Sequence, residues 1–138
     1  MNKKIRKLVH DKCGGLCAYC GKPLGDDWQV DHVTSKISHY LRTYNNGGTL
    51  EQIKENLKKV DDIDNLLPAI KIINHYKRSL CLESFRKRIK TLHLRLAKLP
   101  KKTGVEKTKR RKEYLFKVAA LFDITIDKPF DGKFYFEK

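Results

Sequence analysis

The sequence has few acidic residues, few cysteines and no long apolar run, and each shortage excludes a class of protein. Its 138 residues include 16 Asp and Glu against 31 Lys and Arg, which gives a formal net charge of +15. No stretch approaches the roughly 20 apolar residues of a transmembrane helix. No apolar segment follows Met1-Asn2-Lys3-Lys4, as a secretion signal would require. We therefore expect a soluble cytoplasmic protein that has no membrane partner.

A disulfide framework is not expected. The chain has few cysteines, and without a secretion signal they are expected to stay in a reducing compartment. The four cysteines are Cys13, Cys17, Cys20 and Cys81. Cys17 and Cys20 form a C-x-x-C pair in the turn-rich segment 13–25. This spacing is typical of a zinc knuckle, in which a tight turn brings two thiolates to one ion. C-x-x-C pairs of redox enzymes lie instead at a strand-to-helix junction.

The excess of positive charge predicts a polyanionic partner. A charge of +15 on a chain of 16.2 kDa repels itself unless a polyanion neutralises it. Nucleic acid is the first candidate and an anionic membrane surface is the second. A basic protein without such a partner is the third reading, and charge alone does not choose among them.

Hydrophobic spacing and turn signals predict one mixed α+β domain over residues 1–138. We expect a short helix or arm at 1–12 and a loop at 33–48 that ends in Asn45-Asn46-Gly47-Gly48. Strands are expected at 28–31 and 132–136, with an extended piece before Pro68. Helices are expected at 50–60, 70–78, 82–99 and after a Thr103-x-x-Glu106 cap.

A set of polar residues follows in a characteristic order. Asp31-His32 ends the first predicted strand, Asn65 follows an acidic turn, Asn74 lies nine residues later, and Lys77 three beyond that. Together with the upstream C-x-x-C pair, these motifs resemble the HNH nucleases, the ββα-metal or His-Me finger family. The chain looks like the small stand-alone phage and bacterial members, and the resemblance covers nearly its whole length.

The resemblance implies an α+β fold built around a ββα-metal finger at about residues 13–80. A basic helical extension over about 81–138, ending in a short strand, would pack against the finger. The extra helix at 50–60 lies in an unusually long stretch between the strand and Asn65, and we expect it to be an insertion near the DNA.

The implied function is that of a metal-dependent endonuclease that hydrolyses DNA phosphodiester bonds. His32 would take the proton of the attacking water, since its unperturbed pKa of about 6.5 suits neutral pH. Asp31 and Asn74 would offer oxygen ligands to Mg²⁺, Mn²⁺ or another divalent cation. Asp31 and His32 take different roles because neighbours on a strand point to opposite faces. Asn65 would hold the loop and ring of His32. Lys77, which shares a helix face with Asn74, would reach a phosphate beside the metal.

The sequence departs from four-cysteine members of this family at the zinc ligands. Ile70 and Ile73 stand where a second C-x-x-C would precede Asn74. Two ligands do not close a tetrahedral site, so we expect that Cys17 and Cys20 have lost structural zinc and that the isoleucines pack in the core. In the alternative, other groups complete the site, and the candidates are His10, Cys13 and Cys81.

Basic side chains toward the C-terminus are expected to hold DNA phosphates. Such contacts position the backbone and carry little sequence information. The predicted set is Arg78, Arg86, Lys87, Lys90, Lys109, Arg110 and Arg111. Two other readings stay open, namely a catalytically inactive nucleic-acid-binding protein derived from the nuclease fold and a structural zinc-knuckle adaptor. A single finger cuts one strand, so double-strand cleavage would need a dimer or a second event.

Overall fold

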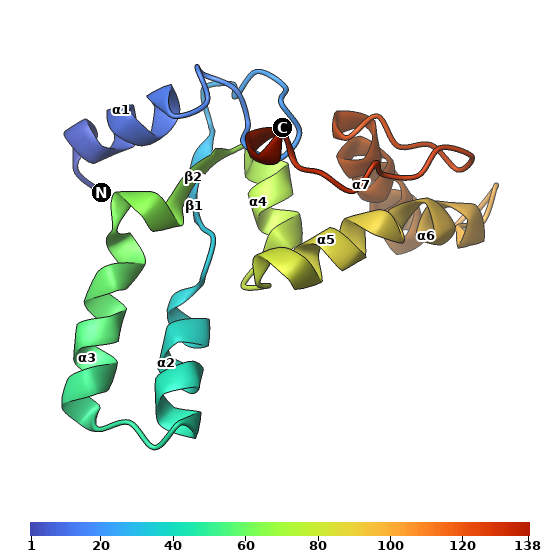
Figure 1. Ribbon diagram of the computed structural model, residues 1–138. Coiled ribbons are helices and arrows are strands. Elements are labelled where there is room, and N and C mark those ends of the chain that lie inside the picture. The colour runs from blue at the N-terminus through green and yellow to red at the C-terminus, as the bar shows by residue number, and fades with distance from the viewer.

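The computed structural model describes all 138 residues, which form seven α-helices and one two-stranded antiparallel sheet (Figure 1). In chain order the elements are α1 (Lys3–Asp11), β1 (Gln29–His32), α2 (Lys36–Asn45), α3 (Leu50–Lys58), η1 (Lys59–Asp61), η2 (Ile63–Asn65), β2 (Leu66–Ala69), α4 (Lys71–Lys77), α5 (Leu82–Lys90), α6 (Leu92–Lys98), α7 (Glu106–Leu121) and η3 (Tyr135–Glu137), where η marks a 3-10 helix. The predicted α+β class is confirmed. None of the helices combines the length and the apolar character that a membrane crossing needs.

The small sheet lies between the α2–α3 segment and helix α4 (Figure 1). Strand β1 pairs antiparallel with β2, so that Asp31 lies opposite Leu67 and His32 lies opposite Leu66. Pro68 is tolerated inside β2 because both strands of a two-stranded sheet are edge strands. Its carbonyl accepts a hydrogen bond of 2.8 Å from the Ala18 backbone N–H, which attaches the C-x-x-C segment to the sheet.

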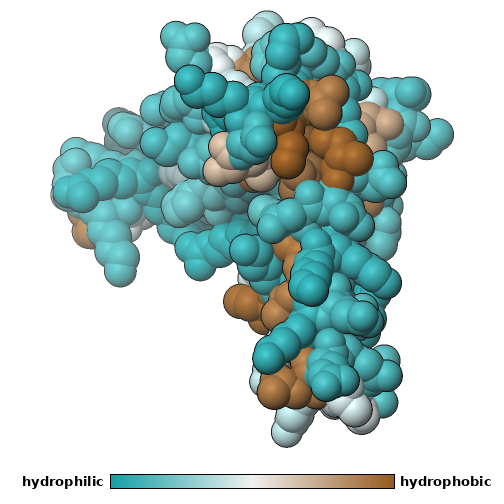
Figure 2. All heavy atoms as spheres, turned by 90° about the vertical axis from the view of Figure 1, so that its left-hand side faces the viewer, coloured by the Kyte–Doolittle hydropathy of each residue, from teal (hydrophilic) through white to brown (hydrophobic).

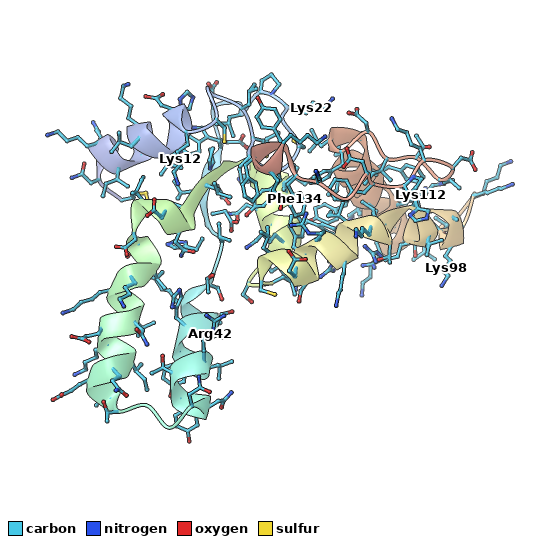
Figure 3. The ribbon with its side chains drawn as sticks, in the orientation of Figure 1. Lys12, Lys22, Arg42, Lys98, Lys112 and Phe134 are labelled. Carbon is cyan, nitrogen blue, oxygen red and sulfur yellow. The ribbon has the colours of Figure 1, made fainter.

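The main core is built around three aromatic rings from distant parts of the chain. Phe134, labelled in Figure 3, stacks on Phe85 with ring centroids 5.3 Å apart. Tyr19 meets the rings of Phe85 and Phe134 edge-on at 5.4 and 5.2 Å. All three rings are buried, so they join the C-x-x-C segment, α5 and the C-terminal segment in one core.

Helices α2 and α3 form a hairpin that projects away from the rest of the molecule (Figure 1). Its surface is mostly hydrophilic, with separate apolar groups toward its tip (Figure 2). The Asn56 amide donates to the Thr43 hydroxyl at 2.8 Å and so links the two helices. The Thr49–Gln52 capping box at the start of α3 is confirmed.

The loop expected at 33–48 is wrong, because α2 occupies most of it. Ser35 caps this helix by accepting a hydrogen bond from the Ser38 backbone N–H. The segment does carry a helical pattern, with Ile37, Tyr40, Leu41 and Tyr44 at helical spacing, so the expectation of a loop gave too much weight to the turn signal that follows. Packing against α3 supplies the remaining stabilisation, as is common for short helices.

The helix expected at 82–99 is two helices, α5 and α6, which are separated at Thr91. Thr91 has φ −101° and ψ 3°, outside the helical range, and its hydroxyl donates back to the Lys87 carbonyl at 3.1 Å. A β-branched residue that bonds its own backbone in this way weakens a helix locally. The expected cap at Thr103 is also wrong, since α7 begins at Glu106 after Val105 without a side-chain cap.

The strand expected at 132–136 is wrong as well, because the chain there ends in the 3-10 helix η3. The segment still attaches to the core through its backbone. The N–H groups of Tyr135 and Phe136 donate to the carbonyls of Tyr19 and Ala18 at 3.0 and 2.8 Å. The apolar alternation that suggested a strand reflects aromatic rings that enter the core.

We expect Phe134→Ala to lower the free energy of unfolding by about 3–5 kcal/mol, because truncating a buried phenylalanine removes apolar contacts and leaves a cavity. Urea unfolding followed by circular dichroism would measure the loss. Phe116→Ala is the matched control, since Phe116 is 37% exposed. Equal losses in the two variants would contradict the central place of Phe134 in the core.

Candidate active site

The candidate site lies where α4 packs against β1. Gln29 and Asp31 share one face of the strand, and Asn74 and Lys77 share one face of the helix. The Asn74 amide donates to the Gln29 side-chain oxygen at 2.8 Å. The Lys77 ammonium lies 3.2 Å from a carboxylate oxygen of Asp31. Two polar pairs therefore hold the helix to the strand in a fixed register.

Asp31 is almost completely buried, with 4% of its surface exposed. The Tyr19 hydroxyl donates to one of its oxygens, and the Lys77 ammonium lies beside both. Burial raises the pKa of Asp31 above its ordinary value, and Lys77 and then Tyr19 oppose that shift. The fold thus keeps a carboxylate inside the protein by surrounding it with hydrogen-bond donors.

Lys77 does not occupy the position that the sequence predicted for it. Its side chain is fully buried, and its ammonium also donates to the His32 carbonyl at 3.1 Å. The expectation that Lys77 reaches a phosphate is therefore wrong. An unpaired carboxylate in the interior is so unfavourable that the buried partner is required.

His32 points away from this pair and toward η1. Its Nε2 atom lies 2.8 Å from a carboxylate oxygen of Asp61. The pKa of Asp61 is lowered mainly by this hydrogen bond, so the carboxylate accepts and Nε2 carries the proton. In the neutral ring, Nδ1 then has the free lone pair. With 28% of the His32 side chain exposed, water has access to the ring.

Asn65 joins both ends of the hairpin, as expected for the residue that holds the loop after His32. Its side-chain oxygen accepts from the Thr34 backbone N–H at 2.9 Å. Its amide donates to the carbonyls of Thr34 and Val60 at 3.0 and 2.8 Å. The expected hydrogen bonds to the loop are present, but the ring of His32 is held by Asp61 instead.

Asp31 and Asn74, the two predicted metal ligands, lie on facing elements but have different partners. Asn74 uses its amide nitrogen on Gln29, and no protein donor binds its side-chain oxygen. No group of three or more His, Cys, Asp or Glu side chains is arranged to hold a metal ion. The donor atoms offered here are therefore one carboxylate and one amide oxygen.

Cys17 and Cys20 lie close together, as their spacing predicts. The pKa of the Cys17 thiol is lowered to about 6, first because Cys20 donates to it and then because backbone N–H groups, that of Ile70 included, point at its sulfur. Ile73 is buried in the same core, and Ile70 packs against it. The expectation that both isoleucines pack in the core is confirmed.

The basic residues predicted to bind phosphates divide into two kinds. Arg86 is structural, because its guanidinium forms an ion pair with Glu137 at 2.5 Å and another with Glu83 at 3.1 Å. The side chain is only 12% exposed, so its assignment to DNA binding is wrong. The remaining members of the set are exposed, namely Arg78, Lys87, Lys90, Lys109, Arg110 and Arg111.

Other lysines at the same end of the molecule hold the protein itself. Lys98 and Lys112 mark the α6–α7 region in Figure 3. Lys112 donates to the carbonyls of Pro100 and Lys101 at 3.1 and 3.0 Å, so it fastens the linker between these helices. Positive charge in this region is therefore partly structural.

Three residues that sequence reasoning missed complete the site. Tyr19 was considered only as a spacer between cysteines, Gln29 as an ordinary strand residue, and Asp61 as part of an acidic turn. A signal for Gln29 existed, because it lies two residues before Asp31 on the same strand face. Comparison with protein-family models, with curated proteins and with solved structures found no match.

We expect Lys77→Met to lower the free energy of unfolding by roughly 3–5 kcal/mol at pH 7, because it leaves the Asp31 carboxylate buried without its partner. Urea unfolding would measure the loss. Lys71→Met, at an exposed lysine of the same helix, is the control. A loss no larger than that of the control would contradict the pairing.

The pH dependence of the same variant has a defined sign. Removing Lys77 removes the largest of the interactions that oppose burial, so the pKa of Asp31 in the folded state rises further above the ordinary value of 3.8. The folded variant then binds a proton more tightly than the unfolded chain, so its stability should recover as the pH falls from 7 toward 4. Lys77→Met combined with Asp31→Asn should not show this recovery.

Proposed function

We propose that the protein is a metal-dependent endonuclease of the HNH type, which hydrolyses DNA phosphodiester bonds with a water activated by His32. The observation that carries the proposal is the imidazole of His32, which Asp61 holds in place and which follows the buried Asp31 on the same strand. The order β1, β2, α4 and the packing of α4 on β1 support a ββα-metal finger.

His32 is suited to act as the general base. Because its Nε2–H donates to Asp61, its Nδ1 is the atom that takes the proton of water. Asp61 then faces the imidazolium that forms and stabilises its charge. Asn65 does not contact the ring itself. It hydrogen-bonds the backbone of Thr34 and Val60, the segments that carry His32 and Asp61.

Asp31 and Asn74 are the residues that would hold a divalent cation, Mg²⁺ or Mn²⁺. Their oxygen donors fit a hard cation, which commonly binds one or two carboxylates and keeps several waters. The ammonium of Lys77 beside Asp31 shows that this carboxylate already accepts a positive charge. A bound cation would stabilise charge on the phosphate and the leaving oxygen.

DNA is the proposed partner, held by the exposed basic residues of α5 and α7. Their phosphate contacts would be independent of sequence, so affinity should fall as salt rises. Structural zinc is left out of the proposal, because Ile70 and Ile73 stand at two of the four ligand positions and pack in or against the core that contains Cys17. A dimer would allow both strands to be cut.

A second candidate function is a nucleic-acid-binding protein that has lost catalysis. The specific observation in its favour is the buried Lys77 ammonium, which already neutralises Asp31 and must give way before a metal ion can bind both oxygens. Incubation of supercoiled plasmid with Mg²⁺ or Mn²⁺, with and without chelator, separates the two. Cutting that stops on chelation supports the nuclease, and binding without cutting supports the alternative.

We expect His32→Ala to slow plasmid cleavage by about 10²- to 10⁴-fold, because general-base catalysis contributes that much. DNA affinity in a filter-binding assay should stay near that of the unmodified protein. His39→Ala, in the projecting hairpin, is the matched control. Cleavage by His32→Ala at an undiminished rate would remove His32 from the mechanism.

Asp61→Asn should lower kcat by roughly tenfold, a part of the full general-base contribution, and leave KM unchanged. An amide can donate as well as accept, so it no longer forces the proton onto Nε2. Asp61→Glu should restore much of the rate. The neighbouring Asp62→Asn serves as the control, since the Asp62 carboxylate accepts no hydrogen bond. A change in KM alone would assign Asp61 to DNA binding.

A further inference from the structure

Four arginines, three from different helices and one from the C-terminal cap of α4, surround one small cavity. Arg78 follows the end of α4, and Arg88, Arg95 and Arg111 come from α5, α6 and α7. The cavity has a volume of about 90 Å³. Its other lining residues are His75, Tyr76, Tyr114 and Leu115, so no carboxylate faces it.

Two of these arginines are held in place by the fold. The guanidinium of Arg88 lies 4.7 Å from the centroid of the Tyr76 ring. Arg95 donates to the Tyr76 hydroxyl at 2.9 Å and to the Thr91 hydroxyl at 2.8 Å. Tyr76 itself is buried, so it acts as a rigid platform for both. Little rotamer freedom remains to be lost when these two side chains bind a ligand.

The cluster lacks the acidic partners that Arg86 and Arg110 have. None of the four forms an ion pair with Asp or Glu, whereas Arg86 on α5 binds Glu83 and Glu137. Bringing several positive charges together without a counter-charge is unfavourable. An anion in this cavity would offset the repulsion among the four guanidinium groups.

We propose that this cavity binds one phosphate group, a phosphodiester of the DNA strand beside the bond that is cut. The assignment to substrate rests on the proposed nuclease function, whereas the assignment to phosphate rests on the cavity alone. Planar guanidinium groups match phosphate oxygens in pairs. About 90 Å³ suits a single group, since pockets for whole small molecules run to roughly 300–1,000 Å³.

The position of the cavity agrees with this assignment. Arg78 directly follows Lys77, whose ammonium contacts Asp31. Arg78 caps the C-terminal end of α4 with a φ of 53°, so the chain leaves the helical path at this residue. The short helix therefore presents Asn74 to β1 and ends in a residue that lines the arginine cavity.

The first test measures phosphate binding without DNA. Arg78→Gln combined with Arg111→Gln removes two guanidinium groups whose side chains donate no hydrogen bond to the protein, so folding should be preserved. Lys3→Gln combined with Lys4→Gln, on α1, removes the same charge elsewhere. Thermal unfolding is compared in sodium phosphate and in sodium chloride of equal ionic strength.

Phosphate should raise the Tm of the unmodified protein and of the α1 control above the chloride value, because a ligand of the folded state stabilises it. The arginine double variant should lose this difference. An equal rise in all three proteins would overturn the proposal. Arg88→Gln provides a second variant in the same cavity, with the same expected loss.

The second test identifies the source of the phosphate, using duplexes with 5′-phosphate and with 5′-hydroxyl ends in the presence of chelator. Removing the cavity should weaken binding to both duplexes and reduce the slope of log affinity against log salt by about 0.9, one phosphate contact. An effect confined to the phosphorylated duplex would overturn the strand assignment in favour of a terminal phosphate. No effect on either duplex would overturn the assignment to substrate.

These outcomes stay separate from those of the nuclease proposal. Both binding tests are made without cleavage, so a cavity that takes phosphate in a protein that never cuts DNA would overturn only the catalytic proposal. Conversely, cleavage by a protein whose Tm responds equally to phosphate and chloride would overturn only the inference about the cavity.

Discussion

The buried pair between Asp31 and Lys77 is the interaction on which the arrangement around it depends. A carboxylate inside the protein is tolerated only when donors surround it, and here Lys77 and the Tyr19 hydroxyl do so. The requirement fixes three things together, namely the register of α4 on β1, the position of the C-x-x-C segment that carries Tyr19, and the backbone of His32, whose carbonyl receives the same ammonium. Stability and site geometry therefore share one group of atoms.

The same pair creates a tension in the proposed chemistry. Replacing a buried ion pair by apolar residues is often neutral or stabilising, so the pair is poor evidence of selection for stability alone. A divalent cation that binds Asp31 has to compete with the Lys77 ammonium, so the proposed metal site would fill only above a certain cation concentration. The plasmid experiment and the Lys77 variant examine the two sides of this competition.

The sequence predicted those parts of the fold that local patterns determine. Strand β1 and the capping box of α3 were found because alternation and caps are short-range signals. The bonds of Asn65 to the loop after His32 were expected from motif order and are present. The helix α2 could have been predicted from its Ser35 cap and its helical apolar spacing, but the turn signal at its end favoured a loop. The break at Thr91 was not predicted, because it interrupts an otherwise regular apolar stripe. Sequence patterns did not predict three features, namely the burial of Lys77, the bond between Asp61 and His32, and the arginine cavity. Each of them brings together residues that only tertiary packing places side by side.

The projecting hairpin leaves the molecule directly after His32 and returns through Asp61 and Asn65. Its two ends are therefore also the two supports of the imidazole. Such an arm works as a lever, with its long side in solvent and its pivot at the ring. Any load on the tip, whether from a bound strand or from collision, would reach the hydrogen bond between His32 and Asp61 before it reached the aromatic core. A displacement of the hairpin would therefore move the Asp61 carboxylate relative to the ring of His32.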